Sequence, residues 1–205
     1  MKAKNYLVSW SGGLDSTYLI WLLLMQGHSV VAVYTELENS GCKTRRELDS
    51  IDKMLPILES YNFKFKGGNK IFIKGSHSQL SLSQPLLWLN SLMYQLEDKT
   101  DIVAVGYILG DDAISYLSDF KKIFNSMLGL TICKKKPKLE FPLIKHHKKV
   151  IYESLPEKLR IHTTWCENFF GDDLCGKCVP CKKMKEYYPE LYTKKIHDKS
   201  MYNLC

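Results

Sequence analysis

The stretch S-W-S-G-G-L-D-S-T-Y, residues 9–18, decides the fold, because it lies where a short apolar run gives way to a longer one. Residues 6–10 have the β-branched and aromatic composition of a buried strand, and residues 17–26 are long and apolar enough for a helix. A second strand-like run follows at residues 29–34. The sequence therefore predicts a strand, helix, strand unit in which the quoted stretch is the first turn.

This turn has the composition of an anion-binding loop. Ser11, Gly12 and Gly13 supply backbone that can curl closely around an anion, and the following helix adds its positive N-terminal end. Ser16 offers a hydroxyl donor, whereas Asp15 suits an anion site only if it caps the helix or holds a divalent cation. A plain flexible turn is the alternative, since a Gly-Gly pair alone also produces one.

Strand and helix patterns continue to alternate up to about residue 107, as is typical of a parallel sheet with both faces covered. We therefore predict an α/β fold, a Rossmann-like parallel sheet flanked by helices. The expected elements are a helix at 45–61, a strand at 70–73, a helix at 84–96, a strand at 101–107, a helix at 116–128, an extended segment at 137–142 and a basic helix at 145–155.

The segment from residue 165 onward is organised by cysteines instead of by hydrophobic period. Cys166, Cys175, Cys178 and Cys181 include two overlapping C-x-x-C steps, so four thiolates can surround one tetrahedral zinc ion. Four protein ligands fill the zinc shell, which predicts a structural site; an iron–sulfur cluster on the same sulfurs is the alternative. We therefore predict two domains, residues 1–160 and a small zinc-binding subdomain at 161–205.

The charge and the apolar stretches of the sequence indicate which kinds of partner the protein can bind. The formal net charge is +7, and all of the excess lies in residues 131–205, because acidic and basic residues balance over residues 1–130. Such an excess attracts nucleotides or nucleic acid, and a solvated lysine surface is the alternative. The longest apolar stretch, residues 18–25, is too short to span a bilayer, and the first residues lack the apolar run of a signal peptide. We expect a cytoplasmic protein without membrane contact.

Two motifs together resemble a known family. S-G-G-L-D-S is similar to the S-G-G-x-D-S signature of the PP-loop ATP pyrophosphatases, whose fold is of the HUP type. Combined with T-x-x-C-x8-C-G-x-C-x-x-C, which begins at residue 163, and with L-E-F-P-L-I at 139–144, it resembles the 7-cyano-7-deazaguanine synthase family over roughly residues 5–188. That resemblance implies an ATP-dependent ligase of queuosine biosynthesis.

The implied reaction converts 7-carboxy-7-deazaguanine and ammonia to 7-cyano-7-deazaguanine (preQ0) through an adenylated carboxylate, with Mg²⁺ beside the ATP and a homodimer as the assembly. Nucleic acid is not required. By the same resemblance Asp15, Ser16 and Glu140 are catalytic candidates. The residues implied to bind ATP and its phosphates are Ser9, Trp10, Ser11, Gly12, Gly13, Leu14, Asp15 and Ser16.

The sequence departs from the family pattern in three segments expected to line the crevice. Y-T-E-L-E-N at 34–39 replaces F-D-Y-G-Q, an Arg-Asn pair falls on Ser83 and Gln84, and I-S-Y-L-S-D at 114–119 replaces S-G-Y-P-D-C. The candidates for substrate contacts are therefore Gln84, Gly106, Asp111, Asp112 and Tyr116. These differences leave open a related PP-loop enzyme, either an amide-forming variant or an RNA sulfurtransferase, and a non-catalytic module that binds nucleotide or nucleic acid.

Overall fold

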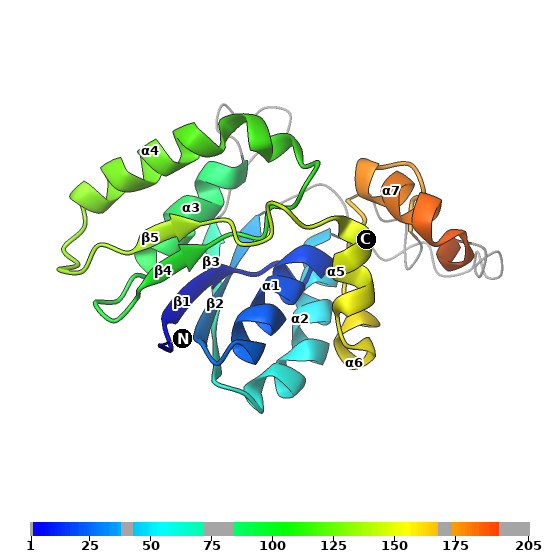
Figure 1. Ribbon diagram of the computed structural model, residues 1–205, viewed down its shortest axis with the longest axis horizontal. Coiled ribbons are helices and arrows are strands. Elements are labelled where there is room, and N and C mark those ends of the chain that lie inside the picture. Colours follow the sequence, from blue (N-terminus) through cyan, green and yellow to red (C-terminus); the bar gives the residue numbers. More distant parts are fainter. Residues whose placement is uncertain (1, 38–42, 72–83, 168–173, 193–205) are drawn as a thin grey trace.

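The computed structural model describes residues 2–37, 43–71, 84–167 and 174–192, and its centre is a five-stranded sheet (Figure 1). Every pair of neighbouring strands is parallel, in the order β3-β2-β1-β4-β5, so β1 is the middle strand. The strands are β1 (Asn5–Ser9), β2 (Ser29–Leu37), β3 (Phe63–Ile71), β4 (Ile102–Ala104) and β5 (Lys138–Glu140).

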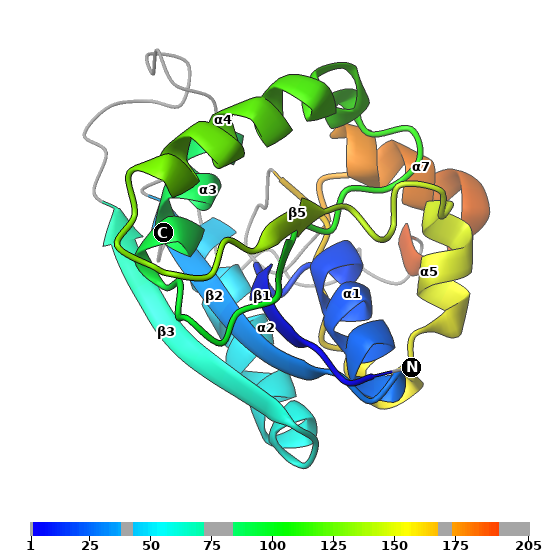
Figure 2. The same cartoon turned by 60° about the vertical axis from the view of Figure 1, so that its left-hand side comes forward.

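Helices cover both faces of this sheet (Figures 1 and 2). One apolar core joins alternate β1 residues such as Val8 to helices α1, α2, α5 and α6, and a second joins Leu7 to helices α3 and α4. The α/β prediction is thereby confirmed. The helices are α1 (Leu14–Met25), α2 (Lys43–Glu59), α3 (Gln84–Tyr94), α4 (Leu117–Gly129), α5 (Lys148–Ser154), α6 (Glu157–Arg160) and α7 (Val179–Tyr187), with short 3-10 helices η2 (Asp112–Tyr116) and η3 (Pro189–Tyr192).

The strand expected at residues 70–73 was placed too late in the chain, because β3 begins at Phe63. Residues 63–66, F-K-F-K, alternate apolar and charged side chains, so they lack the continuous apolar run that is typical of a strand buried on both faces. Phe63 is buried and Lys64 is exposed, as an edge strand covered on one face requires. The Phe63 and Phe65 rings pack edge-on against Trp10 at 5.6 and 5.4 Å, so β3 completes the core beneath the first turn.

A half-buried acid, Glu47, links β2 to α2 beside this turn. The Tyr34 hydroxyl donates a 2.9 Å hydrogen bond to Glu47 Oε2, and Tyr34 is almost completely buried. Burial raises the pKa of Glu47 to about 7, although Lys43 and the Tyr34 hydroxyl oppose the increase. Glu47 is therefore held in a place that favours its protonated form.

The Glu47→Gln variant should be more stable than the parent protein at high pH. The raised folded-state pKa means that the stability supplied by protonated Glu47 is present below about pH 4.5 and is lost as the pH rises through about 7. Glutamine cannot ionise and still accepts the Tyr34 hydrogen bond, so the two proteins should match at pH 4.5 and differ by about 3 kcal/mol at pH 8. Urea unfolding across this range measures the difference, and parallel pH curves for the two proteins would refute the prediction.

Candidate functional site

The loop Ser11–Ser16, which we call the SGGLDS loop, lies at the carboxyl end of the middle strand and runs directly into α1. Its two serines hold it together. Ser16 Oγ accepts from the Ser11 N–H and donates to the Gly13 carbonyl, both at 3.3 Å, while Ser11 Oγ accepts from the Gly13 N–H at 3.4 Å. These long hydrogen bonds occupy the hydroxyl and amide groups that an anion would use, so an incoming phosphate can exchange them for its own oxygens.

The first glycine of the loop is required by its surroundings. Gly12 has φ +69°, and a Cβ placed on it would lie 2.8 Å from the Glu47 carbonyl oxygen and 3.0 Å from Ser50 Cβ. Both obstacles belong to the body of α2, where backbone cannot give way. The loop therefore passes so close to α2 that only glycine fits.

The Gly12→Ala variant should lose about 3 kcal/mol of unfolding free energy, because a left-handed alanine and a backbone clash add their costs. Gly27→Ala is the matched control, since Gly27 has φ +78° with nothing within 4 Å of its Cβ position; it should lose only about 1 kcal/mol. Urea unfolding compares the two. Equal losses would mean that the contact with α2 is not tight.

A buried ion pair stands at the start of α1. Lys148 Nζ, from the first residue of α5, donates to Asp15 Oδ2 at 2.8 Å, and the exposed fractions of the two side chains are 9% and 24%. The other carboxylate oxygen, Asp15 Oδ1, is buried and has no hydrogen-bond partner among the described residues. An acceptor left free in this way suits a divalent cation, and the paired lysine suits a phosphate.

The loop after β4 brings a second carboxylate to the same place. Asp111 Oδ2 accepts from the Ile108 N–H at 2.9 Å. Burial raises the pKa of Asp111, the charge of Asp15 raises it further, and the lysines Lys148 and Lys183 oppose the increase. The charges of Asp15 and Lys148 thus both act on the Asp111 carboxyl group.

Gly106 explains how these two loops come so close. A Cβ on Gly106 would lie 3.2 Å from Ser16 Cα and 3.3 Å from the Ser16 nitrogen. Gly106 thus packs directly against the backbone of Asp15 and Ser16, and its role here is close packing instead of a side-chain contact.

The remaining candidates are more scattered. Glu140 is the last residue of β5, opposite Ala104, and its charge contributes, after burial, to raising the pKa of Tyr6 on β1. Asp112 and Tyr116 begin and end η2 after the crevice loop. Gln84 begins α3, on the face of the sheet away from α1, and its predicted neighbour Ser83 lies outside the described residues.

Trp10 and Leu14 belong to the core, with about 1% of each residue exposed. The Trp10 indole N–H donates to the Thr17 hydroxyl at 3.0 Å. Their backbone groups remain at the crevice, whereas their side chains support the loop from below.

The four cysteines predicted to bind metal converge on one point. Their sulfur atoms all lie within 4.8 Å of one another, and none forms a disulfide. Cys175 Sγ accepts N–H bonds from Lys177 at 3.4 Å and Cys178 at 3.3 Å, and Cys166 Sγ accepts from Cys175 at 3.3 Å. Gly176 takes φ +65° to make this turn possible. We call this unit, Cys166 with residues 174–181, the cysteine knuckle.

The donor set fits a tetrahedral metal ion. Sulfur-to-metal bonds of about 2.3 Å place four thiolates roughly 3.8 Å apart, within the observed spread. Burial would raise the pKa of Cys175, but the N–H donors of Cys178 and Lys177 outweigh it and lower the pKa to about 6. Burial raises the pKa of Cys181, whose sulfur lies deepest. The knuckle thus already stabilises thiolate charge on one side, as a metal site does.

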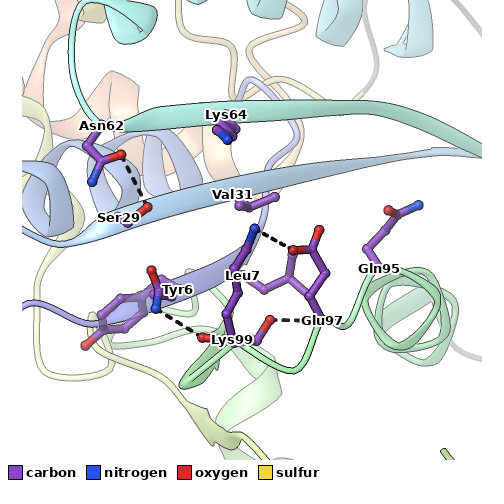
Figure 3. A pocket seen from close by; sticks show the side chains of 11 residues that line it. Tyr6, Leu7, Ser29, Val31, Asn62, Lys64, Gln95, Glu97 and Lys99 are labelled. Carbon is purple, nitrogen blue, oxygen red and sulfur yellow. Dashed lines mark hydrogen bonds and ion pairs between the residues drawn. The ribbon is translucent and has the colours of Figure 1, made fainter. Parts of the chain in front are cut away.

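A separate hollow of about 150 Å³ opens at the opposite, amino-terminal edge of the strands (Figure 3). It is lined by β1, the beginnings of β2 and β3, and the segment after α3. Its acid, Glu97, is ion-paired with Lys66 and, at 2.7 Å, with Lys99. The hollow is therefore separate from the SGGLDS loop, and its lysines outnumber its one acid, because Lys64 also lines it.

Comparison with known proteins agrees with the motifs. No family model matches the sequence. A curated protein of Sulfolobus acidocaldarius named 7-cyano-7-deazaguanine synthase is 26% identical over 210 residues, which cover 89% of this chain. The predicted resemblance is confirmed. The chain spans about half the length of that synthase, because the match covers 45% of it.

Two solved structures are among those to which this chain is similar. The U34-tRNA thiolase of Methanococcus maripaludis, determined with its 4Fe–4S cluster, has a TM-score of 0.49 at 16% identity and covers 94% of this chain and 70% of its own. The NMN synthetase of Francisella tularensis has a TM-score of 0.38 at 18% identity over 74% of this chain and 60% of its own. In the part of the chain that the structure describes, no helix is long and apolar enough to cross a membrane.

Three site residues escaped the sequence reasoning. Lys148 was seen only as one of several lysines in a basic run, and its partner Asp15 lies 133 residues earlier. Thr164 forms a parallel bridge with Gly13, and Lys183 donates to the Gly110 carbonyl at 3.0 Å. The E-F-P-L-I segment ends four residues before Lys148. Closeness to that motif was the sequence feature that could have marked Lys148 as a site residue.

Proposed function

We propose that the chain is an ATP-dependent ligase that converts 7-carboxy-7-deazaguanine and ammonia to 7-cyano-7-deazaguanine. The observation that carries the proposal is the 26% identity, over 89% of the chain, to a synthase of that name. The geometry supports it, because the serine- and glycine-rich loop lies at the end of the middle strand, and its Asp15 holds the cation Lys148 beside it.

The first step activates the substrate. A carboxylate oxygen of the deazaguanine attacks the α-phosphorus of ATP, the bond from that phosphorus to the bridging oxygen of the β-phosphate breaks, and pyrophosphate leaves. In this proposal Ser11, Ser16 and the Gly13 N–H hold the departing pyrophosphate in exchange for their present hydrogen bonds within the loop. Lys148 is placed to neutralise its charge, since its ammonium is already desolvated and aimed at the loop.

The later steps use the activated carbon. Ammonia attacks the acyl carbon and AMP leaves, which gives the amide; a second ATP then adenylates the amide oxygen, and loss of AMP and protons gives the nitrile. Mg²⁺ would offset phosphate charge, and Asp15 and Asp111 are the carboxylates placed to hold it. Glu140 is the proposed substrate contact at the end of β5.

Zinc is the proposed metal of the cysteine knuckle. Four sulfur ligands leave no position for a reacting water, so the ion would hold residues 161–205 together as a subdomain beside the ATP-binding residues 1–160. We further propose a homodimer in the cytoplasm.

The purified protein should therefore contain about one zinc per chain and be colourless even when prepared without oxygen. An iron–sulfur cluster on the same sulfurs would make it brown. Metal analysis together with the visible absorption spectrum decides between the two. Iron and acid-labile sulfide in place of zinc would reverse the assignment.

Mass spectrometry of the products tests the function. Protein incubated with 7-carboxy-7-deazaguanine, ATP, Mg²⁺ and ammonium should yield the nitrile with two pyrophosphates per molecule; an amide with one pyrophosphate would identify an amide-forming variant. Absence of any new product while pyrophosphate is released would point to another carboxylated base. Neither product nor pyrophosphate would overturn the proposal.

One observation favours a second candidate, an enzyme of the same ATP chemistry that acts on RNA. Lys145, Lys149, Lys182 and Lys185 are exposed on α5, α7 and the segment before α5. Polyanion binding through such lysines falls steeply with salt. Among the described cysteines, four share the cluster, and Cys133 is half-buried and donates to the Leu96 carbonyl. Tight, salt-dependent tRNA binding with no small-molecule product would support this candidate.

A further inference from the structure

Two contacts join the cysteine knuckle to two loops, the SGGLDS loop and the loop after β4. At the first loop, Thr164, two residues before the first cysteine, pairs with Gly13 as a parallel bridge. The Leu14 N–H donates to the Thr164 carbonyl at 3.1 Å, and the Thr164 N–H donates to the Gly12 carbonyl at 3.3 Å. The chain that leads into the knuckle is therefore held to the loop by one isolated bridge with two backbone hydrogen bonds.

At the second loop, α7 contacts the segment that follows β4. Lys183, two residues after the last cysteine, donates its ammonium to the Gly110 carbonyl at 3.0 Å. Gly110 has φ +85° and directly precedes Asp111, so this hydrogen bond fixes the turn that presents the Asp111 carboxylate. Lys183 itself is half-buried, unlike its exposed neighbours Lys182 and Lys185.

We propose that the cysteine knuckle is a positioning element of the nucleotide site, with Thr164 holding the SGGLDS loop and Lys183 holding the loop that carries Asp111. The inference rests on the nucleotide site proposed above. The knuckle then has a second effect besides folding its own segment. A metal bound at Cys166 and Cys181 keeps Thr164 and Lys183 at a fixed spacing.

The physical reason is ordering. Residues 163–165 and α7 are separated in sequence by the rest of the knuckle, and the four thiolates bring them together. Without the metal, no bond joins the four sulfur atoms, and the two contacts lose their common support. The loops must then be ordered when the nucleotide binds, and that entropy cost appears as weaker affinity.

Hydrogen exchange tests the loop side without requiring activity. A chelator that removes zinc and leaves magnesium is added to the full chain, and amide exchange is followed with and without the metal. Protection of the Leu14 and Thr164 amides against exchange should fall by at least about tenfold. A tenfold fall means that the free energy of local opening is lower by about 1.4 kcal/mol. Amides of the β1–β2 ladder should be unchanged. Unchanged protection at Leu14 and Thr164, with loss confined to the knuckle, would overturn the proposal.

Substitution of Lys183 tests its contact with the loop that carries Asp111. Lys183→Met should weaken Mg²⁺–ATP binding, measured by calorimetry, by about fivefold, as expected for one hydrogen bond. Lys183→Arg keeps a donor and should restore most of the affinity, and Lys182→Met, on the same helix, should leave it unchanged. Equal affinities for Lys183→Met and Lys182→Met would refute the role of Lys183, as would a loss confined to thermal stability.

The hydrogen-exchange and Lys183 experiments can fail independently of the proposed function. If the parent protein binds ATP but makes no deazaguanine product, the substrate assignment fails while both arms still decide the inference. If it binds no ATP, the nucleotide site fails, and the exchange experiment still shows whether the knuckle orders the SGGLDS loop.

Discussion

Lys148→Met should lower kcat/KM for pyrophosphate release by about 100- to 1000-fold, because it removes the buried cation that faces the phosphate loop. The substitution keeps the length of the side chain and changes its charge. Lys149→Met is the matched control: Lys149 is the next residue of α5, is exposed, and has only a 3.9 Å contact with Glu153. Steady-state kinetics of both variants measure the effect.

A loss of folding must be separated from a loss of chemistry in that variant. Removing Lys148 leaves Asp15 as an uncompensated half-buried charge, which is itself destabilising. The double variant Asp15→Asn, Lys148→Met removes both charges and should recover most of the thermal stability while remaining inactive. If Lys148→Met retained more than a tenth of the parent activity, Lys148 would be only a structural partner of Asp15.

Cys181→Ser should abolish metal binding and detach the C-terminal segment from the sheet. Cys181 is fully buried among the other three sulfurs, and its loss breaks the tetrahedral set. Metal binding at such sites is worth on the order of 10 kcal/mol. The segment's own cysteine cluster is small, and the other buried apolar side chain among its described residues is Met184, which packs into the main core. Metal analysis and limited proteolysis, with cleavage expected after residue 160, measure the outcome.

Cys133→Ser is the control for that experiment, because Cys133 lies outside the cluster and contacts the Leu96 carbonyl. It should retain the metal and resist protease like the parent. A Cys181→Ser protein that still held stoichiometric metal would show that the four cysteines are not the ligand set.

The sequence predicted the features that depend on neighbouring residues. The turn after β1 was found because six consecutive residues carry it, and the knuckle was found because three of its cysteines lie within seven residues. The parallel sheet followed from apolar runs separated by helical patterns. In each case the physical requirement, a close backbone approach or a tetrahedral shell, fixes residue types at short spacing.

The features that the sequence did not predict depend on distant contacts. The Asp15–Lys148 pair spans 133 residues, and the Thr164–Gly13 bridge joins the start of the chain to the knuckle, so neither has a local pattern. The misplaced start of β3 has another cause: an edge strand needs only every second residue to be apolar, which weakens its signal. Burial of Glu47 likewise depends on how α2 packs on β2.

Transfer of the isotope ¹⁸O from the substrate tests the central claim, adenylation at the SGGLDS loop, most directly. The 7-carboxy-7-deazaguanine is labelled in its carboxylate and incubated with unlabelled ATP, Mg²⁺ and ammonium, and the nucleotide products are weighed by mass spectrometry. The account predicts that every AMP formed gains one ¹⁸O while pyrophosphate remains unlabelled. Label in inorganic phosphate together with ADP, or AMP without label, would contradict it.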